Sequence, residues 1–296
     1  MAEQVAGAVA PANQEAVRAW DTVLYERWRK HREVFVGSLE PMTDEFLKRY
    51  PPPVGGRCID IGCGFGETAR QLAGLVGPQG FVLGTDSSPH FVEDARQEAA
   101  DADVENVEFE ASDAQTAHWE PVYDYAFSRT GTMFFALPVQ AMRAIRGSLK
   151  PGGELHKIVW NRKNESPLFT MTEAVVLEFL SRPEEYEADT CGPGPFSMGN
   201  PETLTGILEA SGFEDIKLEQ HDFDYLIGRD IDEALAATLA IGPGAELIRL
   251  NGEHGESLKP EIASALAERY AELRRPDGTI VNHASVWFAS AKNPAS

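Results

Sequence analysis

A glycine-rich segment in the first third of the chain has the residue types of a nucleotide-binding turn. It reads CIDIGCGFGETA over residues 58–69, where Asp60 is followed by Gly62, Gly64 and Gly66. Glycines between a strand and a helix let the backbone lie close to a ligand. A dinucleotide-binding turn has the spacing G-x-G-x-x-G, with its last glycine at residue 67 here. Residue 67 is glutamate, so the segment predicts a nucleotide ligand and disfavours a dinucleotide.

Two further acidic residues follow strand-like segments. Asp86 follows GFVLGT, and Asp113 follows VEFEAS. In nucleotide-binding folds an acidic residue at a strand end binds ribose hydroxyls, and we expect this role for Asp86. We expect Asp113 to accept an amino hydrogen while the N–H of Ala114 meets a ring nitrogen. Together these two residues would recognise the edge of an adenine.

Strand and helix patterns alternate between residues 51 and 160, which determines the fold class. Apolar strand-like segments occupy residues 57–62, 80–86, 104–113, 123–130, 154–160, 216–227 and 280–291. Helical patterns lie between the first and second, the second and third, and the fourth and fifth of them. The alternation predicts an α/β fold with a Rossmann-like, seven-stranded, mostly parallel sheet and helices on both faces. Ligands of such sheets lie beyond the carboxyl ends of the strands.

Helical segments flank and interrupt this sheet. Apolar residues at helical spacing predict one amphipathic helix over residues 13–35, and MTDEFLKRY predicts a short helix with Thr43 as its N-cap. The predicted units are an N-terminal helical cap (1–50), a core (51–160, 200–228 and 278–296) and two lid insertions (161–199 and 229–277). The first insertion leaves the sheet at its ligand edge, so we expect it to help roof the pocket.

The order and spacing of these motifs resemble the class I S-adenosylmethionine-dependent methyltransferases. The resemblance covers about residues 55–160 and rests on D-x-G-x-G-x-G, TD, SDAQ and LKPGG. The segments FSRTGTMFF, WNRKNESP and GPGPFSMGNPETLTGILEASGF extend it over most of the chain and are similar to a bacterial small-molecule subgroup. The resemblance implies S-adenosylmethionine as the cofactor.

The resemblance also implies roles for individual residues. The backbone of Gly62, Cys63 and Gly64, in the turn that Gly66 completes, would lie against the methionine portion and the ribose. Asp60 would receive the methionine ammonium, and Asp86 the ribose hydroxyls. The remaining cofactor-binding candidates are Ser87 or Phe91 beside the adenine, Asp113 and Ala114 at its edge, Ser128 near the reacting methyl, and Trp20 or Trp28 over the methionine end. Ser87 departs from the family, where an apolar residue often follows the ribose-binding acid.

Methyl transfer is an in-line displacement, so the protein must hold the acceptor about 3 Å from the methyl and exclude water. Some acceptors also need a general base. Arg129, after the fourth strand, would bind a substrate carboxylate or phosphate, or form a structural ion pair. His156, inside the fifth strand on the face of Ile158 and Trp160, is a candidate base or a buried structural histidine. Glu165, after the fifth strand, is a candidate base or a helix cap.

Composition restricts the partners. The formal charge of −21 disfavours nucleic acids and anionic membrane surfaces. The cysteines at 58, 63 and 191 suggest neither a disulfide framework nor a metal site. The first residues lack the pattern of a signal peptide, and no apolar run reaches the roughly 20 residues that span a bilayer. A cytoplasmic protein acting on a small molecule is expected, and the oligomeric state stays open, with a homodimer as one option.

The leading hypothesis is therefore a methyltransferase that acts on an oxygen, nitrogen or carbon atom of a small molecule in a lidded pocket. One alternative is methylation of a protein or an RNA. A second is a non-catalytic subunit that binds the cofactor. A nucleotide-linked oxidoreductase is a third, and Glu67 in place of the third glycine counts against it.

Overall fold

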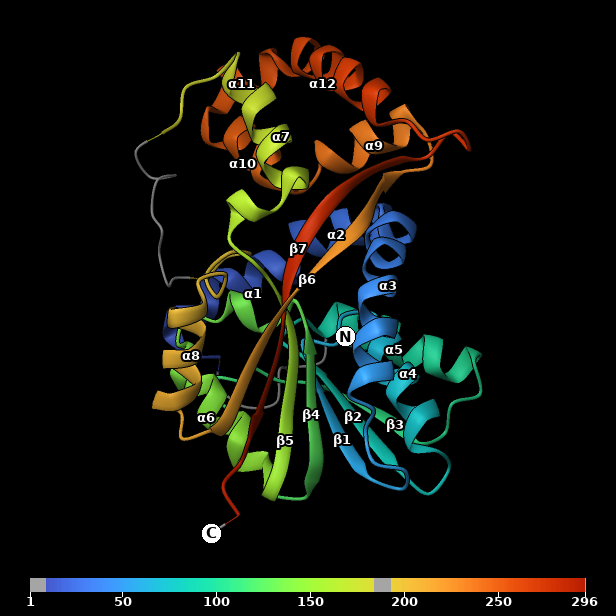
Figure 1. Ribbon diagram of the computed structural model, residues 1–296, viewed down its shortest axis with the longest axis vertical. Helices are drawn as coiled ribbons and strands as arrows, with labels where there is room; N and C mark the ends of the chain where they lie inside the picture. Colours follow the sequence, from blue (N-terminus) through green and yellow to red (C-terminus); the bar gives the residue numbers. More distant parts are fainter. Residues whose placement is uncertain (1–8, 184–192, 296) are drawn as a thin grey trace.

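A seven-stranded sheet forms the centre of the computed structural model, which describes residues 9–183 and 193–295 (Figure 1). The strand order is β3-β2-β1-β4-β5-β7-β6. The strands are β1 (Arg57–Ile61), β2 (Phe81–Asp86), β3 (Val107–Ala111), β4 (Tyr123–Arg129), β5 (Leu149–Trp160), β6 (Glu214–Gly228) and β7 (Ile280–Lys292). Only β7 runs against the others, because it pairs antiparallel with both β5 and β6. The predicted fold class, a mostly parallel seven-stranded sheet with helices, is confirmed.

Helices cover both faces of this sheet, which explains why its central strands are continuous apolar runs. In β1 four of the five residues are buried. In Figure 1, α6 (Pro138–Ser148) and α8 (Pro201–Ala210) lie on one side of the sheet. On the other side lie α3 (Arg32–Arg49), α4 (Glu67–Val76) and α5 (Pro89–Asp101).

The N-terminal segment differs from the single helix predicted over residues 13–35. It folds as a 3-10 turn (Pro11–Asn13), α1 (Gln14–Trp20), α2 (Val23–Lys30) and the start of α3. The predicted apolar stripe is nevertheless kept together, because all of its members line one cavity. These residues are Val17, Trp20, Leu24, Trp28 and Phe35.

The predicted short helix with Thr43 as its N-cap is wrong. Helix α3 runs without interruption through Pro41, and Thr43 lies inside it, fully buried. The Thr43 hydroxyl donates to the carbonyl of Leu39, one turn earlier, at 2.9 Å. A long buried stripe that includes Met42 and Phe46 holds the helix together across the proline.

A lobe of helices, called the helical lobe below, lies beyond the carboxyl ends of the parallel strands (Figure 1). It consists of α7 (Pro167–Leu177), α9 (Ile231–Thr238), α10 (Pro243–Leu250), α11 (Gly252–Ser257) and α12 (Lys259–Leu273). Helix α7 packs against α10 and α12, and α12 packs against α9. The long strands β6 and β7 continue from the sheet into this lobe as a paired ribbon (Figure 1). Residues 184–192 of the predicted first insertion, with Cys191, lie outside the described residues.

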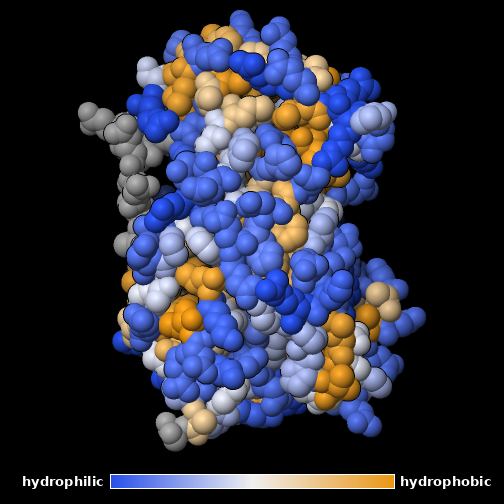
Figure 2. All heavy atoms as spheres, in the orientation of Figure 1, coloured by the Kyte–Doolittle hydropathy of each residue, from blue (hydrophilic) through white to orange (hydrophobic). Residues whose placement is uncertain are grey.

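The visible face of the molecule is largely hydrophilic (Figure 2). The large apolar residues that are exposed are dispersed along the chain as Val23, Val54, Leu75 and Leu137. Within residues 9–183 and 193–295, no helix is both long and apolar enough to cross a bilayer. The same residues hold no group of three or more His, Cys, Asp or Glu side chains placed to bind a metal ion.

Strand β5 contains a lysine in an unfavourable position. Lys157 is completely buried, and its one hydrogen-bond partner among the described residues is the sulfur of Met198, 3.0 Å from Nζ. Thioether sulfur is a weak acceptor. Burial lowers the pKa of Lys157 from 10.5 to about 7, with no opposing effect from a carboxylate. An unpaired buried ammonium destabilises the folded state.

We therefore predict that Lys157→Met stabilises the protein by roughly 2–4 kcal/mol near pH 7. The folded-state pKa is depressed, so the unfolded chain binds more protons between about pH 7 and 10.5, and wild-type stability rises with pH in this window. The advantage of the variant should accordingly shrink from pH 7 to pH 9. Urea unfolding of both proteins at several pH values measures it, and an advantage that does not change with pH would contradict the assignment.

Candidate active site

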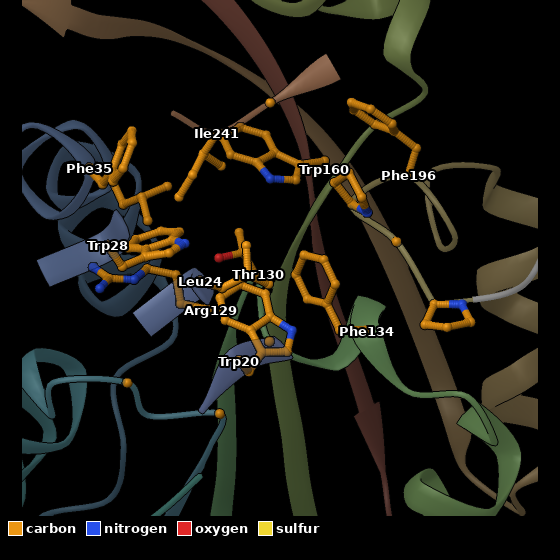
Figure 3. Close-up of a pocket in the computed structure, with 18 of the residues that line it drawn as sticks. Trp20, Leu24, Trp28, Phe35, Arg129, Thr130, Phe134, Trp160, Phe196 and Ile241 are labelled. Atoms are coloured by element: carbon orange, nitrogen blue, oxygen red, sulfur yellow. The ribbon is translucent and has the colours of Figure 1, made fainter. Parts of the chain in front are cut away.

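A cavity of about 1400 Å³ lies at the carboxyl edge of the sheet, between the core, the N-terminal helices and the helical lobe (Figure 3). Its floor comes from the ends of β1, β2 and β4, and its walls from α1, α2, α7 and α10. Sites for drug-sized ligands measure roughly 300–1,000 Å³. This cavity therefore has room for a nucleotide-sized ligand and a second molecule together.

The glycine turn after β1 forms part of the floor. Gly62 and Gly64 line the cavity with positive φ values of 72° and 54°. The N–H groups of Gly62 and Cys63 donate to the carbonyl of Thr85 at 2.8 and 3.1 Å, which ties the turn to β2. A Cβ on Gly62 would stand 3.1 Å from the Cα of Gly131, so the backbone at this point tolerates only glycine.

Gly66 has a different role from the one predicted. It precedes α4 with φ 77°, and a Cβ there would come within 2.8 Å of the Phe109 ring. Gly66 does not line the cavity, so it serves packing of α4 against the sheet. Cys63 does line the cavity, and burial raises the pKa of its thiol well above the usual value, which keeps it protonated.

Asp86 lies at the cavity floor, at the end of β2. Its Oδ2 accepts from the N–H of Gly64 and its Oδ1 from the N–H of Ser88, both at 3.0 Å. Burial raises the pKa of Asp86, and these backbone hydrogen bonds act in the opposite direction. A carboxylate has about four acceptor positions, so capacity remains on the cavity side for further donors.

Ser87 and Phe91 also line the cavity, as predicted for residues beside an adenine. Phe91 is held in an aromatic cluster, with its ring centroid 4.7 Å from Phe65 and 5.2 Å from Tyr25. The cluster fixes the position of this wall. The assignment to an adenine itself stays a prediction.

Asp60 is fully buried just behind the floor, where Ile61 and Thr68 separate it from the cavity. The hydroxyl of Thr68 donates to Oδ2, and Oδ1 has no partner. Burial raises the pKa of Asp60 to about 7, and the charge of Arg129 partly counteracts this. Asp60 thus places a carboxyl group beside the cavity with one oxygen that has no partner among the described residues.

Asp113 and Ala114 are separated by the structure. Ala114 lines the cavity, but Asp113 is buried outside it. The N–H of Ala10 donates to Asp113 Oδ2 at 3.1 Å, and the backbone and side chain of Gln115 donate to Oδ1 at 3.0 and 3.1 Å. Three of the roughly four acceptor positions of Asp113 are therefore already used within the chain. Two buried polar side chains, Ser112 and Asn13, do line the cavity, and Asn13 Oδ1 has no hydrogen-bond partner among the described residues.

The end of β4 places Ser128 and Arg129 differently. Ser128 is buried away from the cavity, where its hydroxyl donates to the carbonyl of Ile61 at 2.7 Å and joins β4 to β1. Arg129 lines the cavity, and its Nη1 donates to the hydroxyl of Thr43 at 3.1 Å. Throughout residues 9–183 and 193–295, no carboxylate oxygen lies within 4.0 Å of this guanidinium. The structural ion pair considered for Arg129 is therefore not found.

His156 does not lie in the cavity, so its candidacy as a base is not supported. It precedes the cavity-lining Trp160 by four residues, which is about 13 Å along a strand. It is buried, it stacks on Tyr125 at 4.5 Å, and its Nε2 lies 3.0 Å from Glu154 Oε2. Glu165 is exposed and also lies outside the cavity, although it does belong to the short turn Lys163–Glu165 before α7. His156 therefore fits the alternative of a buried structural histidine, and Glu165 follows β5 as predicted but does not face the cavity.

Aromatic side chains line the cavity on several sides (Figure 3). Trp20 packs edge-on against Phe134, with ring centroids 4.9 Å apart, and Trp28 lies 5.0 Å from Phe35. Phe169 lies between Trp160 and Phe196 on the side of the helical lobe. Trp20 and Trp28, predicted at the methionine end of the cofactor, both belong to this lining, and Trp28 Nε1 has no hydrogen-bond partner among the described residues.

Sequence reasoning missed most of the cations of the cavity. The described lining residues include six basic and three acidic side chains, although the whole chain has 26 basic and 47 acidic residues. The basic residues are Arg27, Arg129, Arg162, Lys163, Arg182 and Arg249, and the acidic residues are Glu67, Asp86 and Glu246. They come from distant segments, so no local sequence pattern predicts that they line the same cavity.

The central part of the chain matches a known protein family. Residues 54–180 match the family model described as a methyltransferase domain. Aklanonic acid methyltransferase DauC from Streptomyces sp. (strain C5) is 31% identical over 39% of this chain and 53% of its own length. Trans-aconitate 2-methyltransferase from Variovorax paradoxus is 28% identical over 67% of this chain and 66% of its own length. The chain thus spans between half and two thirds of these curated relatives.

A solved structure supports the fold over a longer range. The YcgJ protein from Bacillus subtilis superimposes with a TM-score of 0.54 at 16% identity, covering 88% of this chain and 99% of that one. At this identity the likeness concerns the fold alone. It shows that the sheet and its covering helices are shared.

The glycine turn allows a test by substitution. We predict that Gly62→Ala destabilises the protein by roughly 2–3 kcal/mol, because an alanine there is strained at positive φ and also presses on the backbone of Gly131. Gly64→Ala is the matched control, since its φ is also positive but nothing lies within 4 Å of the added Cβ. It should cost only about 1–2 kcal/mol. Chemical unfolding measures both, and equal losses would contradict a close approach at Gly62.

Proposed function

We propose that this chain, which belongs to the class I S-adenosylmethionine-dependent methyltransferases, transfers a methyl group from S-adenosylmethionine to a small molecule bound in the cavity. The observation that carries the proposal is the floor of the cavity. The glycine turn and Asp86 lie at this floor, and Asp60 is buried behind it, in the chain order of the family motif. The matched segment, residues 54–180, contains all of them.

The residues present fit the cofactor. Asp60 offers an unpaired, buried carboxylate oxygen beside the turn, which suits the cationic methionine end, directly or through water. Asp86 has free acceptor positions for ribose hydroxyls, and Gly62 and Gly64 line the cavity, with open space where a Cβ on Gly64 would stand. When bound, S-adenosylmethionine supplies an activated methyl group on a sulfonium centre.

The contribution of the protein to this reaction is position and exclusion of water. The aromatic walls of Trp20, Trp28 and Phe134 would restrain an acceptor above the floor, and the helical lobe would shield it. His156 and Glu165 lie outside the cavity, so we assign neither of them a catalytic role. Among the described lining acids, Glu67 is paired with Arg32 and Glu246 with Arg249. The geometry thus favours acceptors that need little help from a base.

A small molecule is favoured as the acceptor by the enclosed, aromatic cavity. The related proteins are named for small-molecule acceptors as well, aklanonic acid and trans-aconitate. The overall charge of −21 opposes an RNA substrate. The methylated atom, whether oxygen, nitrogen or carbon, is left open by these features.

Calorimetric titration tests the proposal directly. The purified protein should bind S-adenosylmethionine and S-adenosylhomocysteine with micromolar affinity and should not bind NAD. Binding followed by transfer of labelled methyl to members of an acceptor library distinguishes an enzyme from a cofactor-binding subunit. If the protein binds neither adenosyl compound, the proposed function is refuted.

Asp86 provides a sharper prediction. Asp86→Ala should weaken binding of S-adenosylmethionine at least tenfold, about 1.4 kcal/mol, because a charged acceptor for two hydroxyls is lost. The matched control is Glu105→Ala, which removes an exposed acid far from the cavity and should leave the affinity unchanged. Calorimetry measures both affinities, with thermal melting to establish that each variant is folded. An unchanged affinity in Asp86→Ala would refute the ribose assignment.

A further inference from the structure

Arg129 is a cation in the cavity, and no carboxylate among the described residues forms an ion pair with it. It sits at the end of β4, lines the cavity and is partly buried. Its one described partner is the neutral hydroxyl of Thr43, so at least one of its five N–H donors is used and the rest are open to a ligand. Buried cations are normally paired, because burial without a partner is costly.

The acids whose charges act on Arg129 form no ion pair with it. Glu67 is paired with Arg32, and Asp60 accepts from Thr68 at one oxygen while the other has no partner among the described residues. Both influence Arg129 only through space, and burial still lowers the pKa of the guanidinium as the dominant effect. Because arginine stays charged in proteins, this leaves a permanent positive charge at the cavity wall.

The position of Arg129 relative to the glycine turn indicates which group of a ligand would lie beside its positive charge. Asp60 is the register partner of Phe127, and Arg129 lies two residues further along β4. Residues two apart in a strand share a face, so Asp60 and Arg129 lie on the same face of neighbouring strands, with Cα atoms about 8 Å apart. They form a negative and a positive group side by side, without an ion pair between them.

From this arrangement we propose that Arg129 binds the carboxylate of a ligand in the cavity. This carboxylate would lie next to the place where Asp60 receives the methionine ammonium. The inference rests on the proposed function. The location beside the turn of Gly62 favours the carboxylate of the methionine portion of S-adenosylmethionine. An acidic acceptor offers the same chemistry, and the excess of basic side chains over acidic ones around the cavity suits either source. Arg129 is therefore a binding residue, and its effect is expected in affinity.

The experiment is a thermodynamic cycle measured by calorimetry. Its four corners are wild type and Arg129→Leu, each titrated with S-adenosylmethionine and with decarboxylated S-adenosylmethionine, which lacks only the carboxylate. Wild type should bind the decarboxylated compound at least tenfold more weakly. Arg129→Leu should bind S-adenosylmethionine at least tenfold more weakly than wild type does, but the decarboxylated compound nearly as well.

Two controls separate binding from structure. Thr43→Val removes the hydroxyl partner of Arg129 but keeps its charge, so it should change both affinities less than threefold. Arg129→Lys keeps a cation and should retain part of the discrimination between the two compounds. The comparison within wild type needs no variant, so the proposal stays testable even if Arg129→Leu does not fold.

A second arm examines an acidic acceptor. Benzoate is titrated into wild type and Arg129→Leu, each saturated with S-adenosylhomocysteine. In one outcome, Arg129→Leu changes neither adenosyl affinity but loses benzoate binding. Arg129 then binds the carboxylate of the acceptor, and the proposed carboxylate site is supported. No difference between wild type and Arg129→Leu in either arm overturns the proposed carboxylate site. Equal losses for both adenosyl compounds also overturn it. A wild type that binds no adenosyl compound instead refutes the proposed function.

Discussion

The main-chain contacts between the glycine turn and the end of β2 are the constraint on which the rest of the site depends. Thr85 receives two backbone hydrogen bonds from the turn, and the Asp86 carboxylate receives a third from Gly64. These bonds set the distance between two neighbouring strand ends and aim both the turn and the carboxylate at one space. Positive φ values at Gly62 and Gly64 are the conformational requirement for this geometry. The backbone therefore determines the positions from which the side chains reach the cavity.

Local sequence patterns predicted the strands and the glycine turn well, because these elements are specified by short segments of the chain. The strands, their parallel arrangement and the places of Gly62, Cys63, Gly64, Asp86, Ser87, Phe91, Ala114 and Trp28 on the cavity follow from short motifs and strand ends. Patterns identify which face of an element a side chain occupies. They do not reveal which residues of a strand reach the ligand, which is why His156 stayed a candidate base although it lies about 13 Å along β5 from the cavity-lining Trp160.

The errors arise where a partner is distant in sequence. Asp113 is engaged by Ala10, 103 residues away, and no motif around either residue announces that hydrogen bond. Thr43 resembles a helix start, but tertiary burial of α3 outweighs that local preference. The breaks at Asp21 and His31 within the predicted N-terminal helix carry no proline or glycine. The positive charge of the cavity was missed for the same reason, because its basic residues come from many elements of a chain that is acidic as a whole.

The ribbon of β6 and β7 has a mechanical consequence. The two strands stay paired from Glu214 to Gly228 and carry the core sheet directly into the helical lobe. A hinge across this ribbon would break a row of main-chain hydrogen bonds at once, so the lobe and the core are stiffly joined. The N-terminal helices α1 and α2, in contrast, add no strand to the sheet and are held by side-chain contacts. These include the aromatic cluster of Tyr25 with Phe65 and Phe91 and the hydrogen bonds from Tyr25 to Asp94 and from Arg27 to Ala240. Displacing α1 and α2 from the cavity would therefore cost side-chain packing but would leave the main-chain pairing of the sheet intact.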